Sequence, residues 1–397
     1  MSSAAIATLV LIALIAVVSP VLSELSGRLE VPEIVFQLGL GIVIGPYALG
    51  IADLDTVIRG LSNLGLSYLI FLAGYELETE RMRGRPLRLA VVGWVISLAV
   101  GFAVAFEIVT SGLARDTVVI GLALTTTALG PLTPVLRDAG VLPTRFGSYV
   151  MAIGTVGEFG PIVAVALVLT GKEPIVTSLL LVAFVAVAAA TVVLAARTHP
   201  PRLIRILSRH LESSAQLPVR LSLLMIVLLV LLADRLGLDV LLGAFAAGVV
   251  VRRFAAGRQA EIVRAKLEAI GFGFLVPIFF VVSGIAFNLH VFIGDPAAVW
   301  RIPFFLVLML LARGIPVYVL YRHEVPRRQL APMALFSATG LPLIVVITTV
   351  ASTEGRILPV NASSLVAAGL LSVILFPATA LALLREVRPA PAPAQAG

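Results

Sequence analysis

The chain has 397 residues, of which 59% are hydrophobic and 13% are charged, and its formal net charge is +7. Soluble domains carry about 25% charged residues, so this composition excludes an ordinary water-soluble enzyme, and its hydrophobicity excludes a disordered chain. Cysteine is absent, which excludes disulfides, thiolate metal sites and cysteine nucleophiles.

Thirteen apolar segments have the length of helices that cross a bilayer, whose core of about 30 Å needs roughly 20 residues per helix. They are too long for barrel strands and show no period of two. We therefore predict an all-α polytopic membrane protein, in which the ninth span is the shortest. The predicted spans are 4–22, 34–51, 60–78, 87–112, 117–136, 146–170, 174–196, 218–234, 238–251, 268–288, 299–321, 330–352 and 361–384.

The distribution of basic residues supports this number of spans. The loops after odd-numbered spans and the C-terminal tail, with the adjoining span ends, hold 22 of the 29 Lys and Arg residues, whereas the loops after even-numbered spans hold 6. Basic residues concentrate on the cytoplasmic side of a membrane. We expect the N-terminus outside, the C-terminus in the cytoplasm, and a plasma-membrane location. Orientation and contact with anionic lipid account for the basic excess, so no nucleic-acid partner is needed.

The first span lacks the basic leader and cleavage site of a signal peptide, so we expect it to be retained. Two spans are interrupted. The fifth contains Thr125, Thr126 and Thr127 before two prolines, and the twelfth contains Ser337, Thr339, Gly340 and Pro342. Matched Gly/Pro interruptions indicate a transporter's binding site. Because the two spans lie seven apart, they run in opposite directions, as an inverted repeat requires.

This pattern predicts four segments. Residues 1–196 form the first repeat with a connector helix, 197–217 a cytoplasmic loop, 218–388 the second repeat, and 389–397 a disordered tail. If the two interruptions cross, like helix ends face each other, and buried charges of opposite sign would compensate them. Closer to the N-terminus, small residues from Gly39 to Gly45 indicate close helix packing.

Few charged residues lie deep inside a span. Glu158 lies near the middle of the sixth span, Glu107 in the last third of the fourth, and Arg313 inside the eleventh. A charge at mid-bilayer costs at least about 2.5–3.5 kcal/mol and usually lines a pathway or pairs with another charge. We expect Glu158 to bind a proton or a cation, the alternative being a structural pair with an arginine. For Arg313, a structural or dipole-compensating role and direct participation in transport both stay open, and Glu107, nearer the exterior end of its span, is expected to snorkel or to pair.

Several stretches together resemble the monovalent cation:proton antiporter superfamily, and specifically the sodium/hydrogen exchangers and their potassium-efflux relatives. Leu64 to Glu78 resembles a family signature, with Glu76 at its acidic position. Arg313 matches the basic position of the eleventh span. The family's ion-binding pair aligns with Gly157-Glu158, so the first partner is missing here. The other similar stretches are VPEIVFQLGLGIVIGPYALG, LTTTALGPLTPVLRDAG, LADRLGLDVLLGAFAAGVVV and FLVPIFFVVSGIAFNL.

The resemblance implies a fold of inverted repeats with two crossing discontinuous helices, and a homodimer. It implies exchange of Na⁺, K⁺ or Li⁺ for H⁺ at Glu158, by rigid-body movement of spans 4–6 and 11–13 against spans 1–3 and 8–10. Because one carboxylate cannot hold two ligands, we predict one-for-one, electroneutral exchange. Thr126 and Thr127 are predicted cation ligands, and Arg313, Thr339 and Gly340 the charge-compensating partners. Secondary candidates are Gly157, Glu76 and Glu107.

Two other functions stay open at this point. A sodium-coupled symporter could bind an organic anion at Arg313 and the half-helix ends, and the missing first acid also suits a non-transporting sensor or scaffold. The chain contains no Walker A or G-x-S-x-G motif, and its histidines lack metal-ligand spacing. We therefore expect no enzymatic activity, no cofactor and no metal site.

Overall fold

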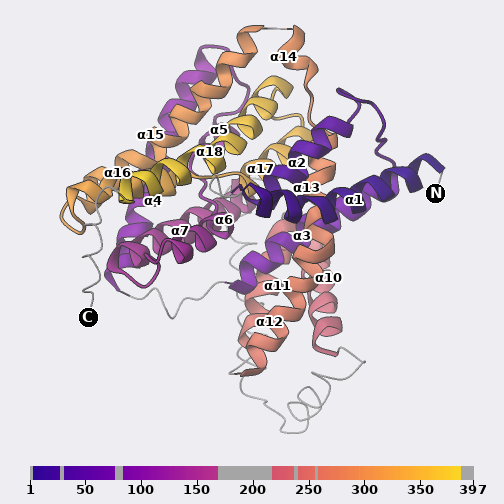
Figure 1. Cartoon of the computed structure of the whole chain (residues 1–397), viewed down its shortest axis with the longest axis horizontal. Helices are drawn as coiled ribbons and strands as arrows, with labels where there is room; N and C mark the ends of the chain where they lie inside the picture. The colour runs from indigo at the N-terminus through magenta and orange to yellow at the C-terminus, as the bar shows by residue number, and fades with distance from the viewer. Residues whose placement is uncertain are drawn as a thin grey trace, which may run out of the picture. The chain divides into compact units, whose positions relative to one another are not determined.

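The computed structural model describes residues 3–26, 31–76, 84–168, 217–236, 240–254, 258–294 and 296–385. Within these ranges every regular element is helical, and eight helical stretches are long and apolar enough to cross a membrane (Figure 1). This confirms the predicted all-α class. Twelve of the thirteen predicted spans fall on described helices. The seventh span, residues 197–216 and the predicted tail lie outside the described residues.

The described helices group into two compact units. The grouping places predicted spans 1–3 with 8–10, and spans 4, 5 and 11–13 with the part of span 6 up to Pro161, close to the division that the resemblance implies. The first unit contains α1 (Ser3–Leu25), α2 (Glu33–Ile44), α3 (Thr56–Glu76), α10 (Leu217–Leu236), α11 (Val240–Phe254), α12 (Arg258–Ile270), a π-helical turn (Gly271–Leu275) and α13 (Val276–Ile285).

The second unit contains the two interrupted spans. Its elements are α4 (Arg85–Thr110), α5 (Thr117–Leu124), α6 (Leu129–Asp138), α7 (Arg145–Val168) up to Pro161, α14 (His290–Gly294), a 3₁₀ turn (Pro296–Trp300), α15 (Arg301–Tyr321), α16 (Arg327–Ala338), α17 (Pro342–Thr353) and α18 (Pro359–Arg385).

Glycine lets helix backbones touch in the first unit. A Cβ on Gly41 of α2, or on Gly45 directly after it, would collide with backbone atoms of α13 at Val281 and Ile285, which confirms the packing that the sequence indicates. On α3, a Cβ on Gly65 would collide with the carbonyl of Leu275. Such close approach maximises van der Waals contact, which drives association of helices in lipid.

We expect Gly65→Ala to lower the stability of the first unit by about 1–3 kcal/mol, because the backbone of the facing segment must move to admit the methyl group. Thermal denaturation in detergent measures this effect. Gly60→Ala is the matched control on the same helix, since nothing lies within 4 Å of its Cβ position. The control should be neutral or slightly stabilising. Equal melting temperatures of the two variants would contradict the close contact.

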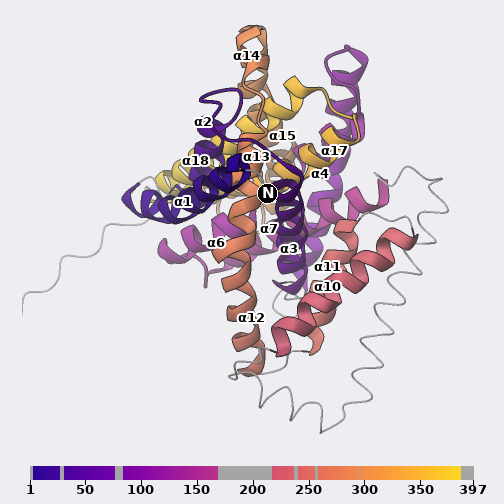
Figure 2. The same ribbon diagram turned by 90° about the vertical axis from the view of Figure 1, so that its right-hand side faces the viewer.

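The tenth predicted span is part of a longer helical segment, formed by α12, the π-helical turn and α13, which begins at Arg258 rather than at residue 268 (Figure 2). Its added first part, α12, is polar, and Arg264 donates to Glu268 at 2.5 Å one turn later. The apolar run marks only the lipid-compatible part of this segment. The helix extends beyond it because backbone hydrogen bonds and i,i+4 ion pairs need no apolar surroundings.

Candidate functional site

Both interrupted helices of the second unit break in the middle, and the breaks touch. The chain is extended at Ala128 (ψ 104°) and at Thr339 (ψ 115°). The amide of Ala128 donates to the carbonyl of Thr339 at 2.7 Å. The two discontinuous helices therefore cross within one unit, as predicted (Figure 1).

Hydroxyl groups satisfy the backbone that these breaks leave open. Thr125 and Thr126 donate to the carbonyls of Leu122 and Ala123, at 2.9 and 3.0 Å, and so cap the end of α5. In the other break, the hydroxyl of Ser372 accepts from the amide of Gly340 at 3.1 Å. Away from water an unsatisfied backbone group costs several kcal/mol. This explains why threonine and serine accompany the interruptions.

Glu158 lies on α7 beside the start of α6. Its Oε2 accepts a hydrogen bond of 3.2 Å from the amide of Leu129, the first residue of α6, and its side chain is half-buried. The N-terminal end of a helix carries partial positive charge and favours a nearby anion. The carboxylate thus lies where the positive end of one half-helix meets the crossing.

Arg313 of α15 lies next to Gly157 and is only 3% exposed. Its guanidinium donates to the hydroxyls of Thr127 and Ser97 and to the carbonyls of Ser337 and Ile153, at 2.8–3.2 Å. Ser337 is the second-last residue of α16, where partial negative charge accumulates. The hydrogen-bond partners of the guanidinium are neutral oxygen atoms, and two of them are backbone carbonyls.

Gly157 leaves the space that this arrangement needs. Its carbonyl accepts from the amide of Thr127 at 2.9 Å. A Cβ at this position would lie 2.5 Å from both the Nη2 of Arg313 and the Oγ1 of Thr127. The space beside Gly157 is therefore filled by Arg313 and Thr127, and no side chain fits there without displacing them.

The two candidate threonine ligands lie in different surroundings. The hydroxyl of Thr127 donates to the carbonyl of Ser337 at 2.5 Å and accepts from both Nε and Nη2 of Arg313. All of its hydrogen-bonding capacity is used in this state. Thr126 uses its hydroxyl hydrogen on Ala123, and its Oγ1 lies 2.8 Å from the Cβ position of Gly340. Thr339 is fully buried and donates to Leu335.

The two remaining acidic candidates are on α4 and α3. Glu107 is exposed on α4, and Glu76 is the last residue of α3, in the first unit. Sequence reasoning missed Ser97, Ser372 and the carbonyl of Ile153. The first two are serines in apolar helices, a weak signal, and a backbone carbonyl leaves no signal at all.

Crossing discontinuous helices with a carboxylate and a guanidinium at the break define a class: membrane proteins with the inverted-repeat transporter fold. The family model of the transmembrane sodium/hydrogen exchanger matches residues 10–386. The chain therefore belongs to the sodium/hydrogen exchanger family, and it is a multi-pass membrane protein.

Individual relatives agree with this family. YjbQ of Bacillus subtilis is 26% identical over 88% of this chain and 58% of its own length. The Na(+)/H(+)-K(+) antiporter GerN of Bacillus cereus is 27% identical over 77% of each chain. The solved structure of the sodium proton antiporter MjNhaP1 from Methanocaldococcus jannaschii covers 93% of this chain and 94% of its own, with a TM-score of 0.66 and 16% identity, and shows the same fold. The chain spans little more than half the length of YjbQ.

Proposed function

We propose that the protein is a secondary active transporter that exchanges a monovalent cation, Na⁺ or K⁺, for H⁺ across the membrane by alternating access. The observation that carries this proposal is the carboxylate of Glu158 at the positive end of α6, beside the crossing of the two breaks. Family membership supports it, as does GerN, whose name includes both Na⁺ and K⁺. Exchange needs no bond chemistry, so the function is transport rather than catalysis.

In the proposed cycle Glu158 binds either a proton or a dehydrated cation. A bound proton neutralises the carboxylate, whereas a bound cation needs its negative charge, so the two ligands compete for one group. Alkali cations are hard and take oxygen ligands. We assign the further ligands to Thr126 and to carbonyls of the fifth-span break. Thr127 would become a cation ligand only after Arg313 stops donating to the Thr127 hydroxyl.

In the same proposal Arg313 is a fixed charge that compensates the negative end of α16. It stays protonated, because guanidinium groups keep their proton in proteins. Both loaded states of the site, Glu158 with H⁺ and Glu158 with a cation, then differ only in which monovalent ligand the carboxylate carries. Thr339 and Gly340 form the matching break, in which Ser372 holds the amide of Gly340.

The setting of the proposed activity follows from the charge pattern and the family. We place the protein in the plasma membrane, with its N-terminus outside and its C-terminus in the cytoplasm. Na⁺, K⁺ and Li⁺ are the candidate cargo together with H⁺, and lipid and a second copy of the chain in a homodimer are the partners. The second unit would move as one body between the outward-open and inward-open states.

The direct test is reconstitution into liposomes that contain a trapped pH dye. Adding Na⁺, K⁺ or Li⁺ outside should drive H⁺ out of the liposomes. For one or two of these cations the H⁺ flux should reach a maximum as the cation concentration rises. Liposomes without protein give the background. Uptake of an organic anion driven by Na⁺, without H⁺ flux, would instead indicate a symporter, and cation binding without turnover would indicate a sensor.

We expect the exchange to be electroneutral, because one carboxylate carries one H⁺ or one monovalent cation in each half-cycle. Imposing a membrane potential of either sign across the liposomes should leave the initial H⁺ flux unchanged within error. The control is to impose the same membrane potential across protein-free liposomes. A flux that increases with potential of one sign would mean unequal charge movement and would contradict a single shared site.

A further inference from the structure

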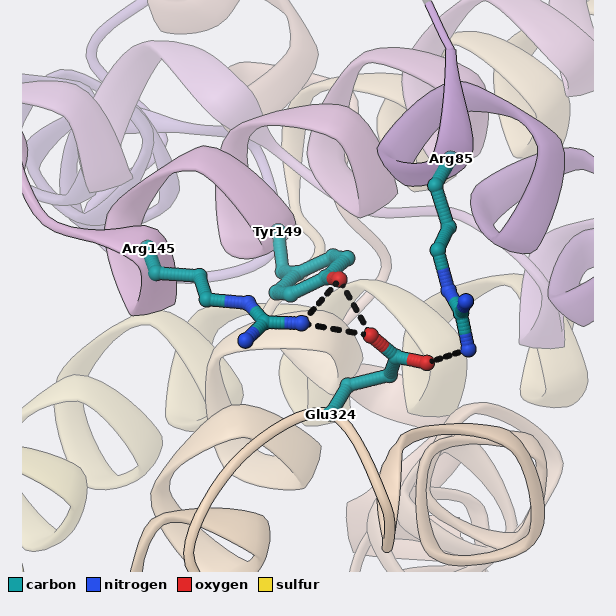
Figure 3. A network of polar contacts seen from close by, with 4 residues as sticks. All are labelled: Arg85, Arg145, Tyr149 and Glu324. Atoms are coloured by element: carbon teal, nitrogen blue, oxygen red, sulfur yellow. Dashed lines mark hydrogen bonds and ion pairs between the residues drawn. The ribbon is translucent and has the colours of Figure 1, made fainter.

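A second polar cluster lies at the other end of α7. Glu324, in the turn between α15 and α16, is buried, and its side chain is only 3% exposed. Its Oε1 accepts from Arg85, the first residue of α4. Its Oε2 accepts from Arg145 at 2.9 Å and from the hydroxyl of Tyr149 at 2.5 Å (Figure 3). One carboxylate thus joins the starts of two helices to the end of a third.

The cluster is built to keep this carboxylate ionised. The Tyr149 hydroxyl, and after it the guanidiniums of Arg85 and Arg145, hold the pKa of Glu324 below its ordinary value against the opposing effect of burial. A depressed pKa means that the stabilisation is present above the ordinary carboxyl pKa and is lost only as the pH falls into the acid range. At neutral pH the cluster is a constant anchor rather than a switch.

Glu324 is fixed to α15 and thereby to Arg313. Its amide donates to the carbonyl of Tyr321, the last residue of α15, at 2.9 Å. The ring of Tyr321 meets the ring of Tyr149 edge-on, with centroids 5.3 Å apart. Arg313 lies on the same α15, and donates to α7 at Ile153. The helices α7 and α15 are therefore joined at two levels.

The residues of α7 that make these contacts lie on one face of the helix. Arg145 and Tyr149 bind Glu324, the carbonyl of Ile153 accepts from Arg313, and the carbonyl of Gly157 accepts from Thr127. These residues are spaced four apart, so they lie along one face of the helix. Glu158 directly follows the last of them. A shift of α7 at the Glu324 end would therefore change the distance between this carboxylate and the amide of Leu129.

The opposite end of the second unit carries corresponding contacts. In the α4–α5 connection Asp116 accepts from Arg356 at 2.6 Å, and it also caps α5. Arg301, the first residue of α15, donates to Asn361 of α18 at 2.5 Å. The connections after α4 and α15, the fourth predicted span of each repeat, thus each hold an acid that is paired with an arginine from the other repeat. This correspondence indicates an anchor that belongs to the fold rather than a chance surface pair.

We infer that Glu324 is a positioning residue for ion binding: by holding the start of α7 to α15 and α4, it sets the place of Glu158 relative to the start of α6. This inference rests on the proposed function, because it assigns a transport role to a residue that touches no substrate. Glu324 acts only through α7.

Glu324→Gln tests the inference, since it keeps the shape and removes the charge. In liposomes the cation KM should rise about fivefold, the effect of one lost hydrogen bond, while the maximal rate stays within about twofold. Hydrogen exchange of the α7 amides should accelerate. Glu107→Gln, an exposed acid on α4, is the matched control and should leave both measurements unchanged. An unchanged KM, with only reduced yield or melting temperature, would overturn the inference.

Tyr149→Phe provides a second variant if Glu324→Gln fails to fold, because it removes one hydroxyl and keeps the packed ring. Its KM and α7 exchange should change in the same direction by a smaller factor, and no change in either would overturn the inference. If the wild-type protein shows no cation-dependent flux, the proposed function fails. The exchange experiment still decides about the anchor, because it needs no transport.

Discussion

Glu158→Gln is expected to reduce cation-dependent H⁺ flux by at least about 100-fold, to the level of protein-free liposomes. The amide keeps the size of the side chain and can still accept from Leu129, whereas it can neither bind a proton nor neutralise a cation. A cation without a counter-charge at mid-membrane costs about 2.5–3.5 kcal/mol, which corresponds to this factor. The measurement is the liposome flux with each alkali cation.

The melting temperature of this variant in detergent serves as the internal control and should stay close to that of the wild type, since the shape is conserved. Glu107→Gln should keep full flux, because that carboxylate is exposed on α4. Saturable H⁺ flux in the Glu158→Gln variant would exclude Glu158 as the shared site and would require another acid to carry the exchange.

Gly157→Ala is expected to cause the second large loss. Its Cβ would lie 2.5 Å from both Arg313 and Thr127, and neither can yield without breaking the hydrogen bonds that hold the guanidinium. Overpacking of this kind costs about 1–3 kcal/mol. We expect a lower melting temperature and a fall in flux of about tenfold or more, measured by thermal denaturation and by liposome transport.

Gly130→Ala is the control for this substitution at the same crossing, since nothing lies within 4 Å of its Cβ position at the start of α6. It should retain flux and melt at or slightly above the wild-type temperature. Full activity of Gly157→Ala would show that Arg313 moves freely. Steric exclusion by Arg313 and Thr127 would then fail to explain why a glycine stands at position 157.

Much of the fold could be predicted because the membrane restricts the options. Lipid permits only helices or closed barrels, so long apolar runs identify the spans, and the alternation of basic residues supports their number. The two interruptions were recognisable through proline, glycine and hydroxyl residues at Thr125 and Pro342. The polar start of α12 escaped this reasoning, because hydropathy reports compatibility with lipid and not the length of a helix.

The candidate site divides in the same way. The sequence by itself determined which charged residues lie deep in the spans, since Glu158 and Arg313 stand out against apolar neighbours. Only the tertiary structure decided that Arg313 binds Thr127 and carbonyl oxygens, that Gly157 makes room for it, and that Glu324 holds the start of α7. These contacts join residues far apart in the chain, and some use backbone atoms common to every residue. Residue type and spacing therefore carry no trace of them until the helices are packed.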